Sequence, residues 1–137
     1  MSGSVFFDTT ILIYSVSIDD RRSTVAEDLL AGGGRISVQV LNEFAAVARR
    51  KLKMSWEEID EALGAIRILC EPAAPLTVEL HEASLKIAAK HGYHIYDSLI
   101  LASAIDAGCN TIYSEDMQDG QRIGPTTIRN PFTTTSR

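Results

Sequence analysis

Two acidic residues each follow a short apolar segment of the chain. Asp8 comes directly after residues 5–7 (VFF), and Asp116 comes two positions after residues 111–114 (TIYS). We expect both segments to be buried strands, because they are short, apolar and aromatic or β-branched. In an open α/β sheet, ligands bind outside the carboxyl ends of the strands. Two acids at such ends are therefore expected to share one crevice.

Two further acids stand on faces of expected helices that are otherwise apolar. Glu43 lies on a stripe with Val40, Phe44 and Val47, at helical spacing. Asp97 lies in the first turn of a helix that continues into an apolar run. Burying an acid on such a face costs free energy unless something positive meets it.

Each acid also has a simpler interpretation. Asp8 can begin an Asx turn, Asp97 can stabilise a helix N-terminus, Asp116 can cap a loop, and Glu43 can pair with a buried arginine. If the four converge, however, two carboxylates about 4 Å apart repel by roughly 4 kcal/mol at an effective dielectric constant near 20. A divalent ion removes that repulsion, and an all-carboxylate set favours Mg²⁺ or Mn²⁺ over Zn²⁺. Such an ion suits phosphodiester hydrolysis.

Apolar segments of strand and helix type alternate along the chain, which predicts an α/β fold with a mostly parallel sheet and helices on both faces. The expected helix starting at Ser55 has a capping box with Glu58. The triple glycine at 32–34 predicts a turn. We expect strands at 4–7, 35–37, 111–114 and 126–129, and helices at 10–17, 22–31, 38–52, 55–70, 77–90 and 95–107. No linker is evident, so we expect one domain at 1–132 and a polar tail at 133–137.

The composition is that of a water-soluble chain in a reducing compartment. The 137 residues are 45% hydrophobic and 23% charged, with a net charge of −5. We expect no signal peptide and no membrane span, since no apolar run approaches ~18–20 residues. Cys70 and Cys109 lie far apart without metal-ligand spacing and are expected to be buried thiols. A cytoplasmic location follows. The negative charge argues against passive nucleic-acid binding, but not against an enzyme that meets phosphates through bound cations.

Four segments carry a likeness to a known family. The stretches FFDTTILIY (6–14), LNEF (41–44), YDSLILASA (96–104) and YSEDMQDG (113–120) resemble, in order and spacing, the four acidic motifs of PIN-domain nucleases. Within that family they look most like the VapC-type toxins of bacterial toxin–antitoxin pairs. The likeness extends over 5–132.

The resemblance implies a PIN-like three-layer sandwich, with a parallel sheet of four or five strands between helices. It implies an endoribonuclease that depends on Mg²⁺ or Mn²⁺, in which activated water attacks RNA and leaves 5′-phosphate and 3′-hydroxyl ends. It also implies an antitoxin partner and a homodimer. The implied catalytic and metal-binding acids are Asp8, Glu43, Asp97 and Asp116, the helper hydroxyls are Thr10 and Ser114, and Asp119 is a candidate fifth acid farther from the ion. Glu115 is expected to point to solvent.

Other interpretations stay open beside the resemblance. The basic run formed by Arg49, Arg50, Lys51 and Lys53 is expected either to hold the RNA backbone or only to complement a helix end. His91 and His94 are interpreted as loop residues. A PIN-like nuclease of RNA processing and a non-catalytic RNA- or partner-binding module are the alternative functions. A phosphatase with Asp8 as nucleophile lacks the second aspartate that it would need two positions later.

Overall fold

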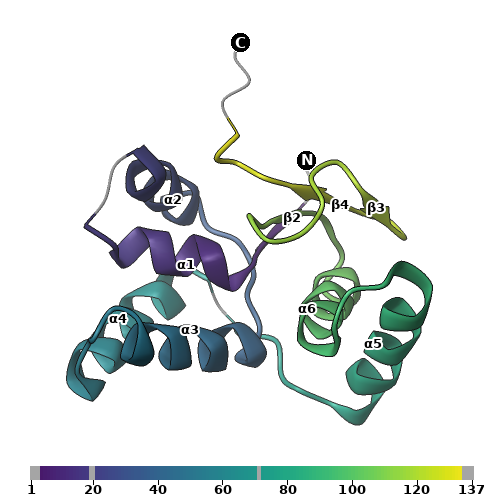
Figure 1. The fold of residues 1–137 in the computed structure, drawn as a ribbon, viewed down its shortest axis with the longest axis horizontal. Helices are drawn as coiled ribbons and strands as arrows, with labels where there is room; N and C mark the ends of the chain where they lie inside the picture. The colour runs from purple at the N-terminus through teal and green to yellow at the C-terminus, as the bar shows by residue number, and fades with distance from the viewer. Residues whose placement is uncertain (1–3, 19–20, 71, 134–137) are drawn as a thin grey trace.

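The computed structural model describes residues 4–18, 21–70 and 72–133. Within them, helices and short strands alternate as the sequence predicts (Figure 1). In chain order the elements are β1 (Ser4–Phe7), α1 (Thr9–Val16), α2 (Arg21–Ala31), α3 (Val38–Arg50), α4 (Trp56–Leu69), α5 (Val78–His91), α6 (Ile95–Asp106), β2 (Cys109–Tyr113), β3 (Arg122–Ile123) and β4 (Thr126–Arg129).

The sheet has four strands in the order β1-β2-β4-β3. Strands β1, β2 and β4 are parallel, and the two-residue β3 runs antiparallel to β4 at the edge. We did not predict β3, because two residues are too few to show a strand pattern. In place of the expected strand at 35–37 the structure has two isolated β-bridges. Arg35 pairs with Phe6, and Ser37 pairs with Ala74.

Helices cover both faces of the sheet. Successive residues of a strand point to opposite faces, and both Phe6 and Phe7 of β1 are fully buried. Helix α1 contacts β1 and helix α6 contacts β2. Figure 1 shows α1 to α4 gathered on one side of the molecule and α5 with α6 on the other. The predicted α/β fold with a mostly parallel sheet is therefore confirmed.

Local sequence signals set the helix ends. The predicted capping box at α4 is confirmed: Ser55 Oγ accepts from Glu58 N at 3.0 Å, and Glu58 Oε1 accepts from Ser55 N at 2.7 Å. The turn after α2 contains Gly33 with φ of 81°, a conformation that favours glycine. The hydroxyls of Ser37 and Thr77 cap α3 and α5 in the same way as that of Ser55. The Ser37 cap fixes where α3 begins, and with it the position of Glu43 on that helix.

Both cysteines are buried free thiols, as predicted. Burial raises the pKa of the Cys70 thiol to about 11, so the reactive thiolate is scarce at neutral pH. Within the described residues, no helix combines the length and the apolar character that a bilayer span requires. Most of the expected polar tail, residues 134–137, lies outside the described residues.

Candidate metal centre at the strand ends

Asp8 and Ser114 meet because they follow neighbouring parallel strands. Phe7 pairs with Tyr113 in register, and Asp8 N donates to Tyr113 O at 3.0 Å just beyond the last pair. Ser114 Oγ then donates to Asp8 Oδ2 at 2.6 Å. Asp8 Oδ1 accepts from Thr9 N at 2.7 Å and caps α1. One oxygen of Asp8 thus caps α1, through the next residue and not the residue two positions on that an Asx turn requires. The other oxygen faces the end of β2.

Asp8 is a buried carboxyl with a strongly perturbed pKa. Only 2% of the residue is exposed. The pKa of Asp8 is raised to about 7, mainly by burial and also by the charges of Asp97 and Asp116, while the hydrogen bonds from Ser114 and Thr9 lower it. A carboxyl with that pKa is only partly ionised at neutral pH. A cation among these acids would favour its ionised form.

Glu43 reaches the same crevice from α3. Its Oε1 accepts from Thr9 Oγ1 at 3.0 Å, and its Oε2 accepts from Gln39 Nε2 at 3.0 Å. Both donors are neutral. The structure thus gives Glu43 these two partners in place of the buried arginine that we considered from the sequence. The charge of Glu43 also raises the pKa values of Asp97 and Asp116. Glu43 therefore lies among the other three acids.

Asp97 lies in the first turn of α6 beside a residue that sequence reasoning missed. Burial raises its pKa, as do the charges of Asp116 and Glu43, while His94 lowers it. His94 Nε2 lies 3.0 Å from Asp97 Oδ2. His94 lies in the loop before α6, as interpreted, whereas His91 is the last residue of α5 and not a loop residue. The contact of His94 with Asp97 was not predicted. The overlooked signal is the three-residue spacing between them, which joins an N-cap side chain to the third helical residue.

Asp116 is the most exposed of the four acids. Its main-chain N donates to Ser114 Oγ at 3.2 Å, so one hydroxyl contacts both Asp8 and the loop that carries Asp116. Burial raises the pKa of Asp116, the charges of Glu115 and Glu43 raise it further, and His94 and Lys51 lower it. The structure thus brings all four predicted acids to one end of the sheet.

Glu115 is partly buried, with 26% of its side chain exposed, and other side chains bind it, so the prediction that it points to solvent was only partly correct. Tyr14 Oη donates to its Oε1 at 2.7 Å, and Arg22 Nε lies 3.2 Å from its Oε2. Its main-chain N donates to Thr10 Oγ1 at 3.1 Å. The predicted helper hydroxyl of Thr10 thus fixes the loop that carries Asp116.

Asp119 occupies a different position from the four acids. Its Oδ1 accepts from Asn130 N at 2.8 Å, which ties the loop after β2 to the residue that follows β4. Asp119 is exposed. The structure therefore gives it a part in holding this loop.

A cavity of about 390 Å³ leads from the acids along the groove between α1 and α3. Glu43 and Asp116 line it together with apolar side chains that include Ile13 and Val47, and Lys51 also lines it. The basic run at the end of α3 is thus divided, with Lys51 facing this cavity.

Arg49 of the same basic run contacts residues at the junction between α3 and α4. Its guanidinium lies 5.0 Å from the centre of the Trp56 ring, and its Nη1 donates to Met54 O at 3.1 Å. Trp56 is 60% exposed, so this contact lies at the surface of the protein.

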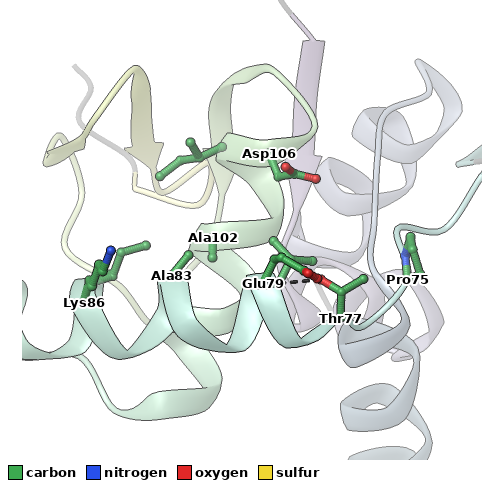
Figure 2. A pocket seen from close by; sticks show the side chains of 10 residues that line it. Pro75, Thr77, Glu79, Ala83, Lys86, Ala102 and Asp106 are labelled. Carbon is green, nitrogen blue, oxygen red and sulfur yellow. Dashed lines mark hydrogen bonds between the residues drawn. The ribbon is translucent and has the colours of Figure 1, made fainter.

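A second cavity, of about 320 Å³, lies between α5 and α6 (Figure 2). Its lining is mainly apolar, with Glu79, Lys86 and Asp106 around it. None of the four acids lines it, so it is separate from the strand-end site.

The donor set at the strand ends fits a hard divalent cation. Across residues 4–18, 21–70 and 72–133, no three carboxylate, imidazole or thiol groups form a ready-made metal cage. Mg²⁺ sites are commonly built from one or two carboxylates, with water and phosphate oxygens completing the shell. Carboxylates that raise one another's pKa across an open crevice match this kind of site.

Comparisons with known proteins agree with this architecture. The PIN domain family model matches residues 5–119. No curated protein sequence matches the chain. Among solved structures, the fold is similar to VapC20 of Mycobacterium tuberculosis, described as a sarcin-ricin loop cleaving toxin, with 23% identity, a TM-score of 0.67, and 82% of this chain and 90% of that chain covered.

Two toxin–antitoxin assemblies are similar as well. A complex from Klebsiella pneumoniae has 19% identity and a TM-score of 0.71, covering 94% of this chain and 98% of that chain. VapBC2 of Rickettsia felis, bound to a DNA fragment from its promoter, has 20% identity and a TM-score of 0.65, covering 92% and 97%. At these identities the likeness concerns the fold. With the family model matching most of its length, the chain belongs to the PIN domain family.

Proposed function

We propose that this protein is a metal-dependent endoribonuclease and the toxin of a toxin–antitoxin pair. The observation that carries the proposal is the convergence of Asp8, Glu43, Asp97 and Asp116 at the ends of β1 and β2, where charges among them raise the pKa values of the three aspartates. Membership of the PIN family and the similarity to a toxin described as cleaving the sarcin-ricin loop support it.

The three aspartates, with Glu43, would hold Mg²⁺ or Mn²⁺. When bound, the ion supplies charge neutralisation at the phosphate and a more acidic water. Ser114 fixes the carboxylate of Asp8 through a bond of 2.6 Å. Thr9 and Gln39 donate hydrogen bonds to Glu43. In this proposal Glu43 would orient the attacking water and accept its proton. The products would carry 5′-phosphate and 3′-hydroxyl ends.

Lys51 is the residue of the basic run that we assign to the RNA backbone. It lines the same cavity as Glu43 and Asp116, so a strand entering the crevice would pass its ammonium group. RNA binding should be measured by anisotropy over a salt series, in an Asp97→Asn background that does not cut. Lys51→Gln should weaken binding and reduce the salt slope by about 0.7 for one lost phosphate contact.

Arg50→Gln, one residue earlier, is the matched control for charge. We expect it to leave the salt slope nearly unchanged. Equal effects of the two variants would show that the basic run acts only as diffuse charge.

The biological part of the proposal is a toxin that acts on RNA in the cytoplasm, forms a homodimer and is neutralised by an antitoxin protein. Expression of the chain alone in bacteria should arrest growth, and co-expression of the antitoxin from the same operon should relieve the arrest. Asp116→Asn should be harmless at equal protein level. Growth without arrest, by a protein that still cuts RNA, would favour a nuclease of RNA processing.

Cleavage of whole-cell RNA by the purified protein tests the enzymatic part. We expect discrete fragments with Mg²⁺ or Mn²⁺ and none with EDTA or with Asp97→Asn. A folded protein that binds RNA without cutting it under any metal would favour a non-catalytic binding module.

A further inference from the structure

His94 contacts Asp97 twice from the position just before α6. Its Nδ1 accepts from the main-chain N of Asp97 at 3.4 Å, and its Nε2 lies 3.0 Å from Asp97 Oδ2. Because Nδ1 accepts from the main chain, Nε2 is the ring nitrogen placed to donate to the Asp97 carboxylate.

The cap alone does not explain a histidine at this position. Helices α3, α4 and α5 are capped by the hydroxyls of Ser37, Ser55 and Thr77, each accepting from the main-chain N three residues later at 3.3, 3.0 and 3.1 Å. Histidine is not among the preferred N-cap residues. What it adds here is a second nitrogen, which reaches the side chain of the same residue whose main chain it caps.

The contact fixes a carboxylate that its neighbours repel. The Asp97 side chain is 17% exposed, whereas that of His94 is 66% exposed. The charges of Asp116 and Glu43 also act on Asp97. An N–H donor held 3.0 Å from Oδ2 can orient this carboxylate.

We propose that His94 is a positioning residue of the metal centre, which holds Asp97 Oδ2 and would leave Oδ1 available as a ligand. This inference rests on the proposed function, in which Asp97 is a ligand. Ligating carboxylates are commonly hydrogen-bonded by partners outside the coordination shell, and loss of such a partner costs 10–100-fold in metal affinity. Because the ring is exposed, we expect the low end of that range.

Two substitutions separate the orienting contact from the cap. His94→Ser keeps a capping hydroxyl and removes the Nε2 donor. His94→Gln keeps an amide donor at similar reach and lacks the short cap. Urea unfolding in EDTA should leave the serine variant as stable as wild type and the glutamine variant less stable.

Mn²⁺ affinity, measured by calorimetric titration, should show the opposite order. We expect His94→Ser to bind roughly tenfold more weakly, and His94→Gln to bind close to wild type. The Mn²⁺ concentration for half-maximal RNA cleavage should rise equally in the serine variant, with cleavage restored at saturating Mn²⁺. His81→Ser, on the exposed surface of α5, is the control for loss of an unrelated imidazole.

The outcomes distinguish this inference from the proposal on which it rests. Wild-type affinity in His94→Ser would overturn the positioning role and leave the nuclease intact. A wild-type protein that neither binds Mn²⁺ nor cuts RNA would overturn both. Tenfold weakening in the serine variant with recovery in the glutamine variant would support the role.

Discussion

Replacing Asp8 by asparagine should remove a loss of stability that the metal-free protein suffers as pH rises. The folded chain raises the pKa of Asp8 from 3.8 to about 7. The folded protein therefore keeps a proton that the unfolded chain has lost between about pH 4 and 7. Stability from this group is present at low pH and is lost as pH rises through that window. About three pKa units correspond to about 4 kcal/mol.

The asparagine amide does not ionise, so the variant avoids this loss of stability at high pH. It also disturbs one hydrogen bond. Ser114 Oγ donates to Asp8 Oδ2 and accepts from Asp116 N, so an amide nitrogen facing it leaves the hydroxyl proton without its acceptor, at a cost of about 1 kcal/mol. In EDTA, Asp8→Asn should then be about 1 kcal/mol less stable than wild type near pH 3, below the window in which the unfolded chain loses its proton. Near pH 8 it should be about 3 kcal/mol more stable.

Urea unfolding at both pH values measures the free energy of unfolding of the two proteins and shows whether their order of stability changes. Saturating Mg²⁺ should restore the stability of wild type near pH 8 and leave Asp8→Asn unaffected, since ligand binding stabilises only the state that binds. Asp60→Asn, an exposed position on α4, controls for loss of one charge. A wild type with equal stability at both pH values, and a variant that never exceeds it, would refute the reasoning from burial and repulsion.

Further substitutions test the parts of the fold that support the site. Ser114→Ala should cost about 1–3 kcal/mol in urea unfolding and raise the pKa of Asp8, followed by NMR, because a buried carboxylate loses its donor; an unchanged pKa would contradict this. Gly34→Ala should destabilise by about 1–3 kcal/mol, because its Cβ would lie 2.5 Å from the Phe7 ring. Gly64→Ala in α4, where a Cβ meets nothing within 4 Å, should stabilise by about 0.5–1 kcal/mol; the same sign for both glycines would contradict the packing.

The four acids could be predicted because each conflicts with its local pattern. Asp8 and Asp116 follow apolar strands, and Glu43 and Asp97 interrupt apolar helix faces. The parallel register then requires the first two to meet, since the carboxyl ends of adjacent parallel strands share an edge. Capping signals such as that of Ser55 placed helix ends to within a residue or two.

The parts that escaped prediction depend on contacts distant in the sequence. Glu115 is held by Tyr14 and Arg22, about a hundred positions earlier, and no local pattern distinguishes that position from a solvated acid. We did not expect His94 to contact an acid, because Gly92 ends the helix before it. His94 is, however, the N-cap of α6 and contacts Asp97 in the first turn of that helix. Strand β3 is defined only by its pairing with β4.

The most direct test of the metal centre is anomalous diffraction from crystals of the protein grown with Mn²⁺. We expect an anomalous peak among the carboxylates of Asp8, Asp97 and Asp116, and no such peak in crystals of Asp8→Asn. A peak only at another position, or a site still occupied in the variant, would contradict the assignment of these acids as the metal ligands.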